Sequence, residues 1–429
     1  MKVLVIGNGG REHALAWKAA QSKMVDTVFV AQGNPGIALE NKIKLVDIKV
    51  TDIDNLVKFA KSENVDLTIV GPEAPLVIGI CDAFNKEGLK IFGPSKMAAS
   101  LEGSKSFTKD FLARHNIPTA HYQVFTKCDE ALTYLDKVGA PIVIKADGLA
   151  AGKGVIVAMD LETAKNAVTD MLSGNAFGEA GSRVVIEEFL EGEEASFIVM
   201  SDGDNVVPMA TSQDHKRIGD GDTGLNTGGM GAYSPAPVVT KEVFDKVMNQ
   251  VIMPTVNGMK AEGNPYVGFL YAGLMIDKNG NPKVIEFNCR FGDPETQPIM
   301  LRMKSDLVDL CLKGATGKLA GETAIYDDRA AVGVVLAAKN YPGKPQTGDE
   351  IFGLKDVYPE DEKVFHAGTA LKDGKIVTNG GRVLCVTALG NSVKEATQKA
   401  YELVKTINWN GMYYRKDIAY RAIKREENK

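Results

Sequence analysis

A polar row near the middle of the chain has the spacing of a metal and phosphate site. Glu286, Asn288 and Arg290 follow one another at intervals of two in VIEFNCRFGDPETQ (284–297). Residues two apart on a strand point to one face, so a single strand would aim an acid, an amide and a guanidinium together. Carboxylate and amide oxygens are ligands that Mg²⁺ takes, together with phosphate oxygens. A guanidinium can stabilise the charge of a transferring phosphoryl group. A half-exposed strand without a ligand is the alternative.

Two lysines and a glycine-rich loop form a second candidate. IVIKADGLAAGKG (142–154) places Lys145 at the end of an expected strand and follows it with Gly148, Gly152 and Gly154. The segment does not match the P-loop pattern GxxxxGK[ST], yet exposed loop amides above a lysine suit ATP phosphates. Lys105, at the start of an expected helix (104–114), supplies a second cation. Each lysine alone is typical of a solvated surface, and the two together are more specific.

An acidic stretch forms a third candidate, for the nucleoside of ATP. VVIEEFLEGEEAS (184–196) runs from an apolar strand into acids. Adenine pairs with extended backbone, and a carboxylate beyond it can bind the ribose hydroxyls. By composition alone, an ordinary acidic strand end remains the favoured interpretation.

The glycine turn near the start of the chain is a poor match to a dinucleotide-binding site. In GNGGREHA (7–14), Glu12 stands where GxGxxG requires its third glycine, and no acid ends the next strand. The amides of a helix N-terminus still suit a phosphate, and Arg11 can assist. A tight turn without a ligand is the alternative.

Composition excludes several classes of protein. The 429 residues are 44% hydrophobic and 24% charged, which indicates a folded chain of about three domains. The net charge of −5 argues against nucleic-acid binding. The five cysteines show no metal-ligand spacing, which favours reduced thiols. No apolar run is long enough to span a bilayer, so we expect a cytoplasmic protein without a membrane segment.

The order of expected elements indicates an α/β protein. Strands and helices alternate over the first hundred residues, as in a parallel sheet. A compact α/β lobe follows, then a long polar loop (213–237), a hairpin (269–287) and a third α/β region. The loop should be functional or mobile. Thr51 is the expected N-cap of a helix that runs to Ser62.

Taken together, these motifs resemble the ATP-grasp carboxylate–amine ligases. More narrowly, RFGDPETQ (290–297), GNGGREHA (7–14), GPEAPL (71–76), QDHKR (213–217) and NTGGMGAYSP (226–235) resemble the phosphoribosylamine–glycine ligase family over nearly the whole chain. The resemblance implies an ATP-grasp core (104–327) with a small mobile lobe (about 121–190), after an N-terminal parallel-sheet domain (1–103) and before a C-terminal α/β domain (328–429).

The resemblance also implies an activity. ATP would phosphorylate the carboxylate of glycine, and the amine of 5-phosphoribosylamine would attack the glycyl phosphate to give glycinamide ribonucleotide, ADP and phosphate in purine biosynthesis. The partners would be these small molecules, with neither nucleic acid nor membrane, and the protein would be a monomer.

The resemblance assigns roles to individual residues. The expected catalytic residues are Lys105, Lys145 and Arg290, and the expected ligands of Mg²⁺ or Mn²⁺ are Glu286 and Asn288. ATP would be held by Lys105, Lys145, Gly148, Gly152, Gly154, Glu187, Glu188 and Leu190, with Glu193 or Glu194 on the ribose. The substrates would be held by Gly9, Gly10, Arg11, Glu12, Pro72, Glu73, Asp214, Lys216 and Asp293.

One feature departs from the wider superfamily, and three alternatives stay open. Many ATP-grasp enzymes carry a further metal-binding acid on the preceding strand, where this chain has YAGLMID (271–277). We therefore expect two protein ligands. The alternatives are another ATP-grasp enzyme of purine synthesis or a carboxylase, a nucleotide-sensing protein without chemistry, and an NAD-dependent oxidoreductase, which Glu12 disfavours.

Overall fold

The N-terminal region is a parallel sheet covered by helices, as expected. The computed structural model describes residues 1–148, 154–173 and 182–428. The strand order is β3-β2-β1-β4-β5, with all strands parallel. Successive strands are added first on one side of β1 and then on the other, and this switch leaves a crevice beyond the carboxyl ends of the strands. The strands are β1 (Lys2–Gly7), β2 (Thr27–Gln32), β3 (Ile43–Val46), β4 (Leu67–Val70) and β5 (Ile91–Phe92). The helices are α1 (Gly10–Ala20), α2 (Pro35–Ala38), α3 (Ile53–Ser62), α4 (Glu73–Val77) and α5 (Ile80–Lys86).

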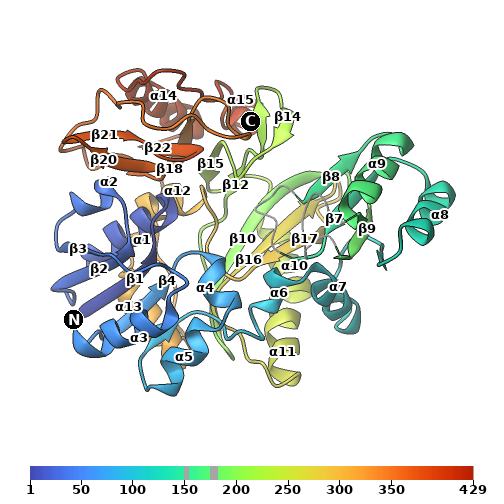
Figure 1. The fold of residues 1–429 in the computed structure, drawn as a ribbon, viewed down its shortest axis with the longest axis horizontal. Coiled ribbons are helices and arrows are strands. Elements are labelled where there is room, and N and C mark those ends of the chain that lie inside the picture. Colours follow the sequence, from blue (N-terminus) through green and yellow to red (C-terminus); the bar gives the residue numbers. More distant parts are fainter. Residues whose placement is uncertain (149–153, 174–181, 429) are drawn as a thin grey trace.

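A small lobe with its own hydrophobic core extends to one side of the molecule (Figure 1). Its four strands pair antiparallel in the order β6-β9-β7-β8, and two helices cover the sheet. The short α6 (Ser100–Gly103) and α7 (Lys105–Arg114) lead into the lobe. The lobe contains β6 (Tyr122–Phe125), α8 (Cys128–Val138), β7 (Ile142–Ala146), β8 (Val155–Ala158), α9 (Leu161–Leu172) and β9 (Val184–Glu188).

A second antiparallel sheet lies between the lobe and the N-terminal region. Its order is β11-β10-β16-β17, and the expected hairpin forms its β16–β17 edge. The strands are β10 (Glu193–Asp202), β11 (Val206–Pro208), β16 (Val267–Ile276) and β17 (Pro282–Asn288). Helices α10 (Lys241–Val247) and α13 (Leu307–Ala315) contact this sheet, and a π-helical turn (Met248–Ile252) and α11 (Met253–Ala261) continue from α10. Helix α12 (Thr296–Arg302) follows β17 in the chain and packs against α1.

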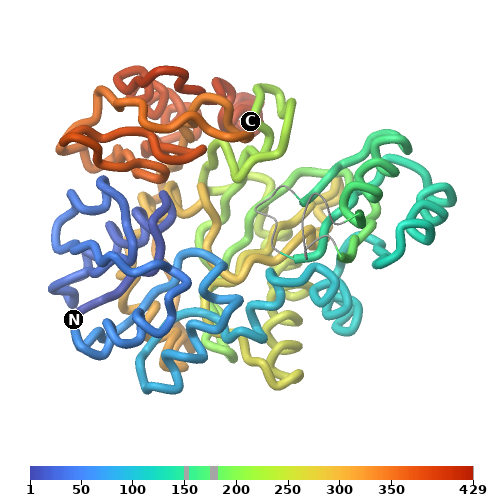
Figure 2. Tube along the Cα trace, in the orientation of Figure 1, coloured from blue at the N-terminus to red at the C-terminus, as the bar shows by residue number. Residues whose placement is uncertain are grey.

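The C-terminal region packs over the N-terminal one (Figure 2), where α1 and α2 meet β19. Its sheet has the order β12-β15-β18-β22-β19, so two strands come from the middle of the chain. The strands are β12 (Gln213–Asp214), β15 (Gly231–Ser234), β18 (Ala330–Ala337), β19 (Glu362–His366) and β22 (Arg382–Gly390), with hairpins β13 (Arg217–Gly219)–β14 (Thr223–Asn226) and β20 (Thr369–Lys372)–β21 (Lys375–Thr378). The helices are α14 (Val393–Val404) and α15 (Tyr420–Glu427).

Two local expectations are wrong. The segment 213–237 is not one long loop, because β12 to β15 lie within it. Strand β12 pairs with β15 and β13 pairs with β14, and β15 also pairs with β18, about a hundred residues later. Helix α3 is capped by Asp52 rather than Thr51, since the Asp52 side chain accepts the N–H of Asn55. Among the described residues, the helices are too short or too polar to cross a membrane.

Candidate functional site

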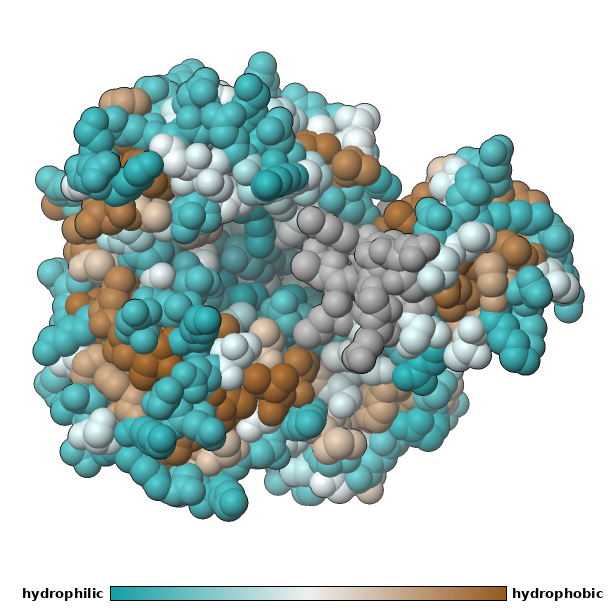
Figure 3. All heavy atoms as spheres, in the orientation of Figure 1, coloured by the Kyte–Doolittle hydropathy of each residue, from teal (hydrophilic) through white to brown (hydrophobic). Residues whose placement is uncertain are grey.

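A cavity of about 580 Å³ collects most of the residues that the sequence singled out. It lies where the N-terminal region, the small lobe and the central and C-terminal sheets meet, and Figure 3 shows hydrophilic side chains around a hollow in this face. The expected residues that line it are Arg11, Glu73, Lys105, Lys145, Gly148, Gly154, Glu187, Glu188, Leu190, Glu194, Asp214, Lys216, Glu286, Asn288, Arg290 and Asp293.

The polar row of β17 points into this cavity. Glu286 and Asn288 lie on the strand, and Arg290 lies two residues beyond its end. Burial opposes ionisation of Glu286, but the charges of Lys216, Lys145 and Arg290 outweigh it and lower the pKa of the carboxyl. Gly273 of β16 pairs with Glu286, and a Cβ there would lie 3.1 Å from Glu286 Cγ. A side chain at position 273 would therefore crowd Glu286 and require it to shift.

Arg290 is held by two acids from the N-terminal region. Its Nε donates to Glu73 at 3.2 Å and its Nη2 donates to Glu102 at 2.8 Å. Glu102 also accepts the main-chain N–H of Cys289 at 2.7 Å. Charge-assisted hydrogen bonds to two separate carboxylates restrict the orientation of the guanidinium plane, so the arginine is oriented before any ligand arrives.

Three lysines lie near the polar row of β17, and Lys145 Nζ donates to the carbonyl of Ile285 on that strand at 3.1 Å. Lys145 Nζ lies 3.0 Å from Glu187 Oε1, and Lys109 Nζ lies 3.1 Å from Glu187 Oε2. Burial lowers the pKa of Lys109 to about 8. Lys105 Nζ donates to the carbonyl of Gly148 at 2.7 Å. Glu187 thus holds two cations in place, in addition to any contact with adenine.

Asp147 joins the glycine loop to helix α7. One oxygen accepts the N–H groups of Lys105 at 2.7 Å and Gly148 at 3.0 Å, and the other accepts Ser106 Oγ at 2.7 Å. Burial opposes the charged form, but these hydrogen bonds outweigh it and lower the pKa of Asp147. The hydrogen bonds of Asp147 therefore fix the first turn of α7, where Lys105 lies.

The two acids at the start of β10 have different surroundings. Glu194 lines the cavity, and its Oε2 lies 3.8 Å from Lys216 Nζ. Glu193 is not among the described residues that line the cavity; Arg425 and Gln213 bind its carboxylate. Of the two expected ribose ligands, the structure therefore favours Glu194. The nearby wall is apolar, with Leu112, Val143, Val157, Phe189 and Ile285.

The N-terminal glycine turn is already occupied by carboxylates. Glu12 accepts the N–H of Gly9 at 2.8 Å, and Asp293 accepts the N–H of Arg11 at 3.4 Å. Glu12 also forms a 2.6 Å ion pair with Arg11 Nε. These acids accept the N–H groups of Gly9 and Arg11, so a phosphate bound at this turn would have to displace them. Gly9, Gly10, Glu12 and Pro72 are not among the described residues that line the cavity.

Two further expected residues, Asp214 and Lys216, lie in the cavity wall. Burial raises the pKa of Asp214 to about 8, and Lys216 Nζ lies 3.5 Å from Glu286 Oε1. His215 between them is structural, since its Nε2 accepts the N–H of Ala419.

Several functional candidates were missed from the sequence. Lys109 lies one turn after Lys105, and this i, i+4 spacing in KSFTK was a signal that could have found it. Glu102, Asp147, Glu295 and Arg382 carried no comparable pattern. Gly152 lies outside the described residues.

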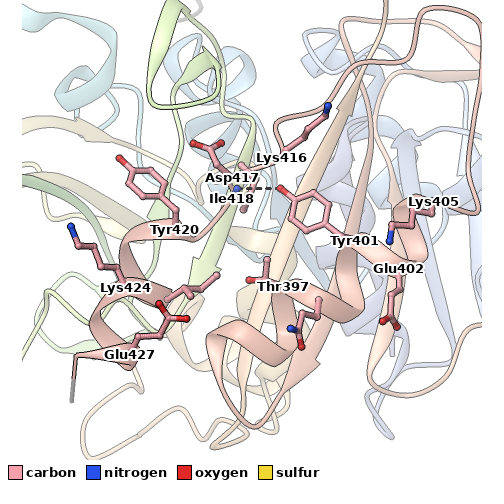
Figure 4. Close-up of a pocket in the computed structure, with 12 residues that line it drawn as sticks. Thr397, Tyr401, Glu402, Lys405, Lys416, Asp417, Ile418, Tyr420, Lys424 and Glu427 are labelled. Carbon is pink, nitrogen blue, oxygen red and sulfur yellow. Dashed lines mark hydrogen bonds between the residues drawn. The ribbon is translucent and has the colours of Figure 1, made fainter.

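A second cavity, of about 610 Å³, lies between α14 and α15 (Figure 4). Its lining mixes three lysines with three acids and contains none of the expected residues. Tyr401 accepts the N–H of Ile418 there at 3.1 Å, a structural contact. The chemistry therefore belongs to the first cavity.

Comparisons with known proteins agree with this geometry. Three models of phosphoribosylglycinamide synthetase match the chain: the N domain over 1–102, the ATP-grasp (A) domain over 103–296 and the C domain over 331–421. The chain is 69% identical to "Phosphoribosylamine--glycine ligase" of Haemophilus influenzae over 429 residues, all of both chains.

Solved structures give the same result. A crystal structure of phosphoribosylamine–glycine ligase from Thermotoga maritima has a TM-score of 0.85 at 35% identity, covering 98% of this chain and 100% of that one. The biotin carboxylase domain of 2-oxoglutarate carboxylase from Hydrogenobacter thermophilus, solved with MgADP, ADP and bicarbonate, has a TM-score of 0.71 at 17% identity, covering 96% and 91%. This second likeness concerns the fold.

Proposed function

The chain belongs to the phosphoribosylglycinamide synthetase family, and on that premise we propose that it joins glycine to 5-phosphoribosylamine with ATP, giving glycinamide ribonucleotide, ADP and phosphate. It is an ATP-grasp ligase by family and fold. The observation that carries the proposal is the single cavity in which Lys105, Lys145, Glu286, Asn288 and Arg290 converge.

The chemistry requires activation of a carboxylate. A carboxylate oxygen of glycine attacks the γ-phosphorus of ATP, and ADP leaves. The amine nitrogen of phosphoribosylamine then attacks the acyl carbon, loses a proton, and phosphate departs with the former carboxylate oxygen. Such phosphoryl transfer depends on positioning and on charge stabilisation.

The cations of the cavity supply that stabilisation. Lys105 and Lys145 are placed to contact the phosphates, and Arg290 is placed to meet the transferring group. Because Glu73, Glu102 and Glu187 already orient these cations, little reorganisation is needed when charge develops.

A divalent ion fits the remaining donors. Glu286 is ionised, and the Asn288 amide nitrogen donates to the carbonyl of Phe287 at 3.1 Å, which leaves the amide oxygen for a cation. Bound with ATP, Mg²⁺ or Mn²⁺ would neutralise phosphate charge.

The nucleoside and the substrates would occupy opposite ends of the cavity. We place adenine against the apolar wall and the backbone of 188–190, with Glu194 on the ribose. We place glycine and phosphoribosylamine near Arg11, Glu73, Asp214, Lys216 and Asp293. Gly9, Gly10, Glu12 and Pro72 would support this end through Arg11 and Asp293.

We also propose the domain boundaries, the oligomeric state and the cellular location of the protein. We retain domains at 1–103, 104–327 and 328–429, and a lobe at about 121–190 that closes over ATP. We propose a monomer that acts in the cytoplasm, where a reducing environment suits the thiols of the described cysteines.

Product analysis tests the proposed function. The protein is incubated with ATP, Mg²⁺ and phosphoribosylamine, and with glycine, bicarbonate or formate as the acyl donor. We expect ADP and an amide product with glycine alone. A product with bicarbonate or formate would assign the chain to another ATP-grasp activity, and ATP binding without glycine-dependent ADP release would indicate a nucleotide sensor.

A further inference from the structure

A contact across the molecule ties the C-terminal helix to the nucleotide end of the cavity. Arg425 of α15 donates from Nη1 to Glu193 Oε1 at 2.8 Å and from Nη2 to Glu193 Oε2 at 2.7 Å. Glu193 is the first residue of β10, 232 positions earlier in the chain. A two-pronged pair fixes both partners in angle as well as distance.

The same contact includes the backbone of the next residue. Gln213 Nε2 donates to Glu193 Oε1 and to the main-chain carbonyl of Glu194, each at 2.9 Å. Tyr233 Oη holds the amide oxygen of Gln213 at 2.8 Å. The network thus fixes the main chain where β10 begins.

The alternation of a strand connects this network to the cavity. Consecutive side chains point to opposite faces, so anchoring Glu193 outside the cavity turns Glu194 into it. Without Arg425, the half-buried Glu193 carboxylate would lose its cation and turn toward water, and the start of β10 would move with it.

We propose that Arg425 is a positioning residue for ATP: through Glu193 it sets the start of β10 so that Glu194 meets the ribose hydroxyls. Arg425, which is not among the described residues that line the cavity, therefore takes part in nucleotide recognition without touching the nucleotide. The inference rests on the proposed function, specifically on ATP ribose at Glu194.

The test compares ATP with 2′-deoxyATP and 3′-deoxyATP in steady-state kinetics. We expect Arg425→Gln to raise KM for ATP about tenfold, because ATP loses one charge-assisted contact with Glu194. The KM for at least one deoxy analogue should change little, because that analogue lacks the hydroxyl that Glu194 binds. The kcat should stay within about twofold. The preference for ATP over that analogue then shrinks. Glu193→Gln should act in the same way.

Two controls make the outcome specific. Lys424→Gln removes the same charge from an exposed neighbour on α15 (Figure 4) and should leave every KM unchanged. Glu194→Gln should abolish the preference, and adding Arg425→Gln to it should change the preference no further. If Arg425→Gln does not fold, the same test can be made with Arg425→Lys, which keeps the positive charge but cannot form the two parallel hydrogen bonds to Glu193.

The contradicting results are distinct. If Glu194→Gln abolishes the preference while Arg425→Gln raises all KM values equally or not at all, the inference is wrong and the proposed function stands. If Glu194→Gln leaves the preference intact, the ribose assignment is wrong and the inference fails with it.

Discussion

Asp147 accepts the main-chain N–H of Lys105 at 2.7 Å, which joins the root of the glycine loop to the first turn of α7. In return, Lys105 Nζ donates to the carbonyl of Gly148. The two proposed phosphate-binding elements, a helix start and a loop, are therefore positioned by one carboxylate.

Asp147→Ala should weaken ATP binding and lower stability. The substitution leaves buried N–H groups without an acceptor and releases the start of α7. We expect KM for ATP to rise about tenfold, measured by ADP formation. Asp160→Ala, which removes the exposed cap of α9, should lower stability slightly without changing KM. Equal effects of both variants on KM would contradict the role of Asp147.

Glu286→Ala should abolish turnover. The change removes the carboxylate from the proposed pair of metal ligands, and losing such an electrostatic group slows catalysis by about 100- to 1000-fold. ADP release at saturating Mg²⁺ measures the effect, and Lys278→Ala in the nearby turn is the control. Activity close to that of the unmodified protein would overturn the metal assignment.

Arg11→Ala should weaken phosphoribosylamine binding and spare ATP. Arg11 lines the cavity near Asp293, far along the chain from the lysines of the phosphate wall. We expect at least a tenfold rise in KM for phosphoribosylamine, the loss of a charged contact. Arg114→Ala, at an exposed pair with Glu262, is the control. A change in KM for ATP alone would show that the N-terminal region does not bind phosphoribosylamine through Arg11.

Lys109 should make stability depend on pH in the alkaline range. Its pKa is about 8 in the folded protein because of burial, against 10.5 for an ordinary lysine. Between these values the unfolded chain binds more protons than the folded one, so stability rises with pH. The rise is on the order of 3 kcal/mol.

Urea unfolding at pH 7 and pH 10.5 measures this rise. Lys109→Met removes the titrating group, so the free energy of unfolding of the unmodified protein should increase relative to that of the variant. A constant difference between the two proteins would show that Lys109 titrates normally.

Much of the fold could be predicted from local patterns. The strand that ends near Lys145 (β7) could be predicted within a residue and the hairpin β16–β17 within two residues at its outer ends, because apolar runs and turn residues mark them. Strands β12 and β15 could not be, since they are short and depend on tertiary pairing: β12 pairs with β15, and β15 pairs with β18, about a hundred residues later.

The candidate site divides in the same way. Glu286, Asn288 and Arg290 could be proposed together because one strand carries them. The partners that orient them could not: Glu102 reaches Arg290 from 188 residues earlier, and Arg425 reaches Glu193 from 232 residues later. Such pairs depend on tertiary packing, which no local spacing encodes.

Isotope transfer shows directly whether a carboxylate is activated by phosphorylation in this cavity. Glycine labelled with ¹⁸O in both carboxylate oxygens is converted with ATP and phosphoribosylamine, and the released phosphate is analysed by mass spectrometry. We expect one ¹⁸O atom in each phosphate. Unlabelled phosphate accompanying amide formation would show that the carboxylate oxygen is not phosphorylated.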